Sequence, residues 1–406
     1  MSEVALAWEL TIALVVVLLF VDFYFHVRKP HAPSLAEAAA WSAAYVGIAL
    51  LFGVLLFFAG GRDQATEYFA GYVTEKALSV DNVFVFLVIM SSFRVPRQDQ
   101  QKVLLFGIVL SLVARTGFIL LGAALIETFS WVFYLFGAAL LVTAGHMLEP
   151  EDETREGRKA DNVVVRVARR LFHTTDYYDG DRLFTVKDGK RAMTPMFMVM
   201  VAIGGTDILF AFDSIPAIFG LTQDVFVVFS ATAFALLGLR QLYFLIDGLL
   251  ERLLYLSYGL AAILAFIGVK LILHALHENN LPFVNDGQPV PVGEIDTGTS
   301  LVFILAVLVV TIVVSLASPK GKAKTAVTAL RRRVAEYLDP DFPADREQRG
   351  RIYARLVDAE RRVEALDPQY RKLIRNPHEL RDLVALAHRR HAAGRDVAPS
   401  DAGATP

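Results

Sequence analysis

The segments EKALSVDNVFVF at residues 75–86 and TDILFAFDSIPAIFG at residues 206–220 decide how this chain folds. Both are apolar stretches that carry two acids six residues apart, with a small polar residue after the second acid. These residues are Glu75, Asp81, Asn82, Asp207, Asp213 and Ser214. An unpaired acid at the centre of a bilayer costs roughly 2.5–3.5 kcal/mol on insertion scales. The acids are therefore expected to line an interior, to pair with bases, or to hold an ion.

Composition places the chain among membrane proteins. Of its 406 residues, 55% are hydrophobic and 20% are charged, and the mean hydropathy is +0.46, which is more apolar than a water-soluble domain. A net charge of −2 gives no global field for nucleic acid. Because the chain has no cysteine, disulfides and thiolate metal sites are excluded, and any metal must use oxygen or imidazole ligands.

Apolar stretches long enough to cross a hydrocarbon layer of roughly 30 Å recur along the chain. We expect about nine transmembrane helices in an all-α, polytopic membrane protein. The predicted spans are residues 8–27, 36–59, 66–93, 103–126, 130–148, 194–219, 224–246, 254–275 and 299–318. No basic region precedes the first span, so we expect it to be retained rather than cleaved.

Lys and Arg set the predicted orientation, because they favour cytoplasmic loops. The connection 149–193 holds ten of them, whereas the segment 276–298 holds none. The connection 149–193, which follows the fifth predicted span, is therefore expected inside, and the N-terminus outside. The polar tail 319–406 begins with Lys320, Lys322 and Lys324 and is expected to be cytoplasmic. Apolar spacing at Ile352, Leu356, Val363 and Leu366 predicts short helices there, with a partner that the sequence does not identify.

The two acidic motifs predict an inverted repeat. Each motif is followed by a span with one arginine, Arg115 or Arg240, which suggests three-helix repeats at about 66–148 and 194–275 within a transporter domain 1–318. The loop charges give these halves opposite orientations, as in many transporters. Chance similarity between short apolar helices is the alternative.

The acids within predicted spans, which include Asp22, outnumber the bases Arg115, Arg240 and Lys270. The surplus needs a cation or protons. The bases are candidates for interhelical ion pairs, and Asp22 for a relay or for a pair with His26 or Arg28.

Helix geometry complicates a shared site, because six residues turn through about 600° and leave the two acids of a motif about 120° apart. Either the helix is distorted so that both acids of a motif reach one site, or the two acids have different partners. Pro216, with Gly204 and Gly205 upstream, predicts a helix break that frees the carbonyl of Phe212. Carboxylate, hydroxyl, amide and carbonyl oxygens suit hard ions such as Mn²⁺, Ca²⁺ or Mg²⁺.

At these two motifs the sequence resembles the TerC family of integral membrane proteins, through EKALSVDNVFVFLVI at 75–89 and TDILFAFDSIPAIFG at 206–220. The resemblance covers about residues 5–318. It implies a tellurium-resistance-associated or manganese-exporting protein. By position, it implies that Asp81, Asn82, Asp207, Asp213 and Ser214 handle the ion, with Glu75 beside them. Many relatives carry an acid at Gly204 and an Asn at Thr232, so the ligand count here can differ.

These observations lead to the hypothesis of a divalent-cation exporter, with Mn²⁺ as the first candidate and protons as the exchanged ion. We expect such an exporter to reside in a bacterial-type inner (plasma) membrane and to have no prosthetic group. Its partners are the lipid bilayer and the cation. The alternative is a membrane component of a tellurium or oxyanion stress-resistance system that acts through partners. We expect no enzymatic activity, because His274, His277 and Glu278 match neither HExxH nor its inverse.

Overall fold

The computed structural model divides the chain into two compact units, described here separately. The membrane unit comprises residues 1–248 and 256–311, and the tail unit comprises 249–255 and 312–406. The residues that the structure describes are 3–27, 35–93, 95–129, 131–148, 182–187, 190–246, 255–279, 281, 284–338, 346–368 and 377–396.

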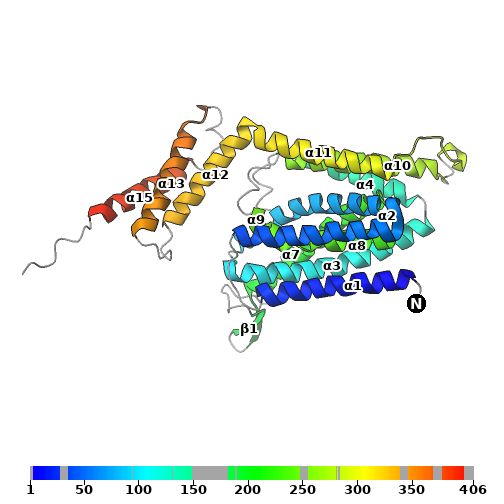
Figure 1. Ribbon diagram of the computed structural model, residues 1–406, viewed down its shortest axis with the longest axis horizontal. Helices are drawn as coiled ribbons and strands as arrows, with labels where there is room; N and C mark the ends of the chain where they lie inside the picture. The colour runs from blue at the N-terminus through cyan, green and yellow to red at the C-terminus, as the bar shows by residue number, and fades with distance from the viewer. Residues whose placement is uncertain are drawn as a thin grey trace, which may run out of the picture. The chain divides into compact units, whose positions relative to one another are not determined.

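The membrane unit is built from helices that lie side by side (Figure 1). They are α1 (Glu3–Asp22) with the π-helical turn η1 (Phe23–Val27), α2 (Leu35–Ser92), α3 (Arg97–Thr128), α4 (Val132–Met147), α7 (Pro195–Phe219), α8 (Val225–Leu236), α9 (Leu239–Ile246), α10 (Leu256–His277) and α11 (Thr297–Ala317), which runs on into the tail unit. A short 3-10 turn, η3 (Asn285–Gly287), precedes α11.

The predicted connection 149–193 falls mostly outside the described residues. Its described part contains the hairpin of β1 (Phe184–Lys187) and β2 (Lys190–Met193), which pair antiparallel with Phe184 opposite Met193.

Seven helices in the described part of the chain are long and apolar enough to cross a bilayer. The predicted class of helical membrane protein is therefore confirmed. The longest of the seven, α2, has 58 residues and covers two predicted spans, with a non-helical residue between them at Gly61, φ 88°. A positive φ is favourable for glycine, which has no Cβ. α4, with 16 residues, is shorter than these seven. The count of nine, the inverted repeat and the orientation stay predictions.

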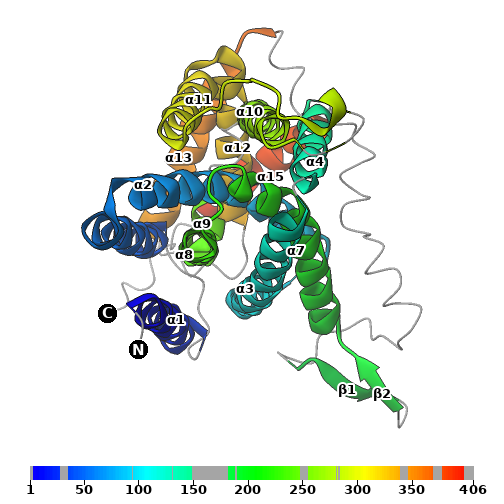
Figure 2. The ribbon, with the colours of Figure 1, turned by 90° about the vertical axis from the view of Figure 1, so that its right-hand side faces the viewer.

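Helices from the two halves of the membrane unit pack against each other. α2 packs on α8 and α9, α7 packs on α3, and α4 packs on α10, as Figure 2 shows for α3 beside α7 and for α4 beside α10. The α4–α10 crossing depends on Gly137 and Gly268: a Cβ on Gly137 would lie 2.8 Å from the Gly268 carbonyl oxygen. Small residues let membrane helices approach this closely.

The helices of the tail unit pack against one another instead of lying separately. α12 (Pro319–Leu338), α13 (Arg346–Glu364) and α15 (Pro377–Asp396) share a hydrophobic core. Its buried members are Val327, Leu330, Val334, Leu356, Ala359, Val363, Leu380, Val384 and Ala387. The apolar spacing that predicted helices around Leu356 and Val363 thus belongs to a three-helix core.

Candidate functional site

Arg115, on α3, is at the centre of a buried polar cluster in the membrane unit. Its side chain has no solvent exposure, and its guanidinium pairs with Glu75 of α2. On the other side, Nε lies 3.5 Å from Asp207 Oδ2 of α7, and Nη1 donates to Ser214 Oγ at 2.9 Å. The Asn82 amide, with its oxygen toward Arg115, accepts from Nη2 at 3.2 Å. One arginine therefore joins the two acidic motifs.

The side chains that meet at Arg115 are seven residues apart on each helix, not six. Seven residues turn through about 700°, within about 20° of two full turns. Glu75 therefore shares a face of α2 with Asn82, and Asp207 shares a face of α7 with Ser214. The first acid and the final polar residue of each motif form the cluster, which we call the Arg115 cluster: Glu75, Asn82, Arg115, Asp207 and Ser214.

The second acids lie elsewhere. Asp213 Oδ1 accepts a hydrogen bond from Thr143 Oγ1 of α4 at 2.8 Å, and Asp81 is half-buried beside Asn82. The expected 120° offset within each motif therefore gives Asp207 and Asp213 different partners. Among the described residues, no three His, Asp or Glu side chains are grouped so that they could hold a metal ion.

The prediction of a helix break around Pro216 is wrong. α7 runs as one helix from Pro195 to Phe219, with Gly204, Gly205 and Pro216 inside it. Tight packing on α3 accompanies the continuous helix, because a Cβ on Gly204 would lie 2.3 Å from Leu110 Cδ2. Pro216 still provides no N–H for the Phe212 carbonyl, but the cluster does not depend on a broken helix.

Polar atoms around the cluster lack hydrogen bonds within the described part of the chain. Both Asp207 carboxylate oxygens and the hydroxyls of Ser79 and Ser111 are buried without such a partner. Ser79 is one turn after Glu75, and Ser111 is one turn before Arg115, so each shares the face of its helix that carries the cluster. Buried polar atoms usually find partners, and these oxygens are therefore available to a ligand.

Contacts between α3 and α7 set the level of Ser111. A Cβ on Gly107 would meet Ile203, and a Cβ on Gly122 would meet Phe219. Residue numbers thus increase in the same direction along both helices, and Ser111 lies at about the level of Asp207. Thr232, where many relatives were expected to carry Asn, is a buried hydroxyl without a hydrogen bond among the described residues.

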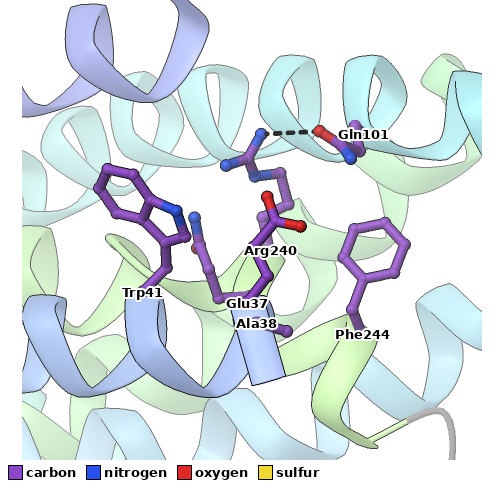
Figure 3. Close-up of a pocket in the computed structure, with 7 residues that line it drawn as sticks. Glu37, Ala38, Trp41, Gln101, Arg240 and Phe244 are labelled. Carbon is purple, nitrogen blue, oxygen red and sulfur yellow. Dashed lines mark hydrogen bonds between the residues drawn. The ribbon is translucent and has the colours of Figure 1, made fainter. Parts of the chain in front are cut away.

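A second buried arginine, Arg240 of α9, pairs with Asp22 of α1. Arg240 Nη2 donates to Asp22 Oδ1 at 2.6 Å, and the same oxygen accepts from Tyr45 Oη at 2.9 Å and from Gln241 Nε2 at 2.9 Å. Arg240 also donates to Gln101 at 3.4 Å beside a small cavity lined by Trp41 and Phe244 (Figure 3). Asp22 thus pairs with Arg240, which was not one of the two partners, His26 and Arg28, that the sequence suggested for it.

The predicted partners of Asp22 are not described: Arg28 and the side chain of His26 lie outside the described residues. Lys270 Nζ donates to Ser300 Oγ at 3.3 Å. Sequence analysis missed Lys76, a base in the α2 span whose ammonium donates to the Ala235 carbonyl at 3.1 Å. Its position next to Glu75 was the available signal.

A polar network ties the connection before α11 to the ends of α7 and α10. His274 Nδ1 lies 2.7 Å from Glu294 Oε1, while Nε2 lies 3.0 Å from Gln223 Nε2 and 3.5 Å from Glu278 Oε2. The hydrogen bond from His274 holds the pKa of the Glu294 carboxyl below its usual value. These contacts join the connection before α11 to α10 and to the residues that follow α7.

Comparisons with known proteins identify one family and several bacterial relatives. The family model described as "Integral membrane protein TerC family" matches residues 60–323. An uncharacterized membrane protein of Mycobacterium tuberculosis is 55% identical over 395 residues, 97% of this chain and 99% of its own length. A protein of Escherichia coli named "Putative membrane-bound redox modulator Alx" is 40% identical over 278 residues, 66% of this chain and 86% of its own length. No solved structure matches.

Proposed function

This chain belongs to the TerC family of integral membrane proteins, and from the charges of its Arg115 cluster we propose that it exports a divalent metal cation in exchange for protons. Mn²⁺ is the first candidate. Its relatives are bacterial, and the proposed location is the inner (plasma) membrane.

The observation that carries the proposal is the surplus negative charge in the cluster. Two carboxylates, Glu75 and Asp207, face one guanidinium, Arg115, and all three side chains are at most 2% exposed. A net charge of −1 in a dehydrated interior is costly. Either a proton or a cation must neutralise it, and alternation between the two is the chemistry of a proton-coupled cation carrier.

The donor atoms support a hard cation. Asp207 and Glu75 offer carboxylates, Ser79, Ser111 and Ser214 offer hydroxyls, and Asn82 offers an amide oxygen. Mn²⁺, Mg²⁺ and Ca²⁺ prefer such oxygen ligands. Protonation of a desolvated carboxyl group removes its charge and releases the ion.

The packing supports alternating access. If α2, α3 and α4 correspond to α7, α8–α9 and α10, a pseudo-two-fold axis exchanges the α2–α8 contact with the α7–α3 contact and maps the α4–α10 contact onto itself. Rocking of two such repeats around a site between them would expose it to each side in turn. Glu75 and Asp207 belong to equivalent helices in this scheme.

Purified protein in liposomes tests the proposal. We expect Mn²⁺ flux that is driven by an opposing pH gradient, and we expect Asp207→Asn to reduce it at least tenfold, because this substitution removes the surplus charge. Asp63→Asn, the same change at an exposed acid, is the control and should transport normally. Asp81→Asn and Asp213→Asn, at two ligands that the family resemblance implies, are measured in the same way. Undiminished flux through Asp207→Asn contradicts the proposal.

Two observations favour the alternative, a stress-resistance component that acts through partners. Arg115 already neutralises one acid of the cluster, and the described residues hold no group of three metal-ligating acids or histidines. Under this alternative, wild-type protein moves no divalent ion in liposomes, while Arg115→Gln abolishes tellurite resistance in cells.

A further inference from the structure

The guanidinium of Arg115 occupies the position in which the oxygen atoms of both motifs converge. It contacts Glu75 and Asn82 on α2 and Asp207 and Ser214 on α7. These are the atoms that a cation between the two motifs would use. We propose that Arg115 is a resident cation, which holds the empty site together and which the transported ion must displace; this inference rests on the proposed export function.

Charge counting gives the displacement its selectivity. With Arg115 in place, the cluster carries −1, and one proton neutralises it. When the guanidinium leaves, Glu75 and Asp207 together carry −2, which a divalent ion neutralises fully and a monovalent ion only by half. Because uncompensated charge in a dehydrated site is costly, Arg115 makes displacement by Na⁺ or K⁺ unfavourable and displacement by a divalent ion favourable.

The contacts of Arg115 are uneven, as a displaceable group requires. It pairs closely with Glu75 and donates to Ser214 at 2.9 Å. In contrast, Nε has no hydrogen bond among the described residues, and Asp207 is 3.5 Å away. Neither oxygen of Asp207 accepts a hydrogen bond from the residues that the structure describes. Asp207 is therefore the group that an arriving ion can bind before Arg115 moves.

Arg240 shows what a fixed arginine looks like in the same protein. Its acid, Asp22, accepts from Arg240 at 2.6 Å and is also held by Tyr45 and Gln241 at 2.9 Å. That carboxylate oxygen accepts three hydrogen bonds, whereas neither Asp207 oxygen accepts one from a described residue. Arg240 with Asp22 is thus the matched control pair for Arg115.

The experiment separates ion binding from ion transport. Mn²⁺ binding to detergent-purified protein is measured from the electron paramagnetic resonance signal of free Mn²⁺, and flux is measured in liposomes. Arg115→Gln removes the competing charge, so we expect it to bind Mn²⁺ about tenfold more tightly or better, equivalent to about 1.4 kcal/mol. We expect its flux to fall at least tenfold, because no guanidinium then replaces Mn²⁺ between Glu75 and Asp207 when the ion leaves.

Control and companion variants keep the result interpretable. The double variant Asp22→Asn/Arg240→Gln removes the other buried pair and should leave Mn²⁺ affinity within about twofold of wild type. Arg115→Lys keeps the charge, but its compact ammonium cannot match the planar contacts of the guanidinium. It should therefore be displaced more easily and bind Mn²⁺ more tightly than wild type, which provides the test if Arg115→Gln does not fold.

Each outcome decides one of the two claims. Tighter binding with reduced flux supports the resident cation. Binding that is unchanged or weaker in both Arg115 variants, while the wild type transports Mn²⁺, overturns it and leaves Arg115 as a structural ion pair. A wild type that neither binds nor moves Mn²⁺ overturns the proposed export function, and the resident-cation mechanism with it.

Discussion

Arg115 and Arg240 are both buried arginines on transmembrane helices, yet their surroundings give them different roles. Arg115 faces two carboxylates with incomplete hydrogen bonding, whereas Arg240 meets one carboxylate oxygen that two further side chains also hold. A buried pair that is broken by removal of one partner leaves an uncompensated charge. The Asp22 pair is therefore expected to matter for stability and the Arg115 cluster for ion handling.

Substitution Asp22→Asn should destabilise the protein, because it removes the carboxylate that pairs with the buried Arg240 guanidinium. We expect a loss of roughly 3–5 kcal/mol in the free energy of unfolding, measured by thermal unfolding in detergent. Tyr45→Phe removes only one neutral donor to the same oxygen and should cost about 1 kcal/mol. Equal losses in the two variants would show that the charge of Asp22 is not what stabilises this site.

Sequence reasoning identified the residues of the central cluster but not their grouping. Glu75, Asp207 and Arg115 were singled out by their charge inside apolar segments, and Asn82 and Ser214 as the small polar residue after the second acid of each motif. The six-residue spacing of the acids left two possibilities open, a distorted helix that brings Asp213 to Asp207 or different partners for the two acids. In the structure α7 is one helix, and residues seven apart share the cluster. Which acid an arginine reaches depends on the packing of α3 on α7, which no periodicity in one segment encodes.

At the scale of elements, the α4–α10 crossing depends on backbone approach. Gly137 and Gly145 are both on α4, but only at Gly137 would a Cβ meet another atom within 4 Å, 2.8 Å from the Gly268 carbonyl oxygen. Gly137→Ala should therefore cost roughly 1–3 kcal/mol through overpacking, measured by thermal unfolding. Gly145→Ala should cost nothing and can gain up to about 1 kcal/mol from helix propensity. The opposite ranking would mean that α4 and α10 are not in close contact.

The connection between α10 and α11 should respond to acid through Glu294. Its pKa lies below the ordinary 4.5 because of the hydrogen bond from His274, so the tie is fully present above pH 4.5. It is lost as the pH falls through the lower folded value. Hydrogen exchange of residues 284–296, corrected for the intrinsic rate, should therefore show weaker protection at pH 3 than at pH 6.

Glu294→Gln is the control for this titration, because glutamine does not ionise. Its exchange should lose most of the dependence between pH 6 and pH 3. The remaining dependence belongs to Asp296, whose pKa is also lowered, by hydrogen bonds from the Thr299 hydroxyl and backbone N–H. Wild-type pH dependence in Glu294→Gln would show that the His274 contact does not hold the connection.

At the scale of the whole molecule, the chain combines a membrane unit with a tail unit that has its own core. The apolar spacing at Leu356 and Val363 predicted a helix, but not that α12 and α15 would cover its apolar side. Single-sequence periodicity reports which face of a helix is apolar and is silent on what covers that face.

A core substitution in the tail unit tests whether the two units are separable in stability and function. Leu356 is fully buried, so Leu356→Ala should cost the tail roughly 2–5 kcal/mol, seen as faster tryptic cleavage within residues 319–406. Asp358→Ala breaks an exposed pair with Arg362 and should change cleavage little, because such pairs contribute about 0–1 kcal/mol. Mn²⁺ flux should stay within about twofold of wild type in both variants, since the Arg115 cluster is formed by membrane-unit residues alone. A large loss of flux in Leu356→Ala, together with normal flux in Asp358→Ala, would instead make the folded tail a part of the transport cycle.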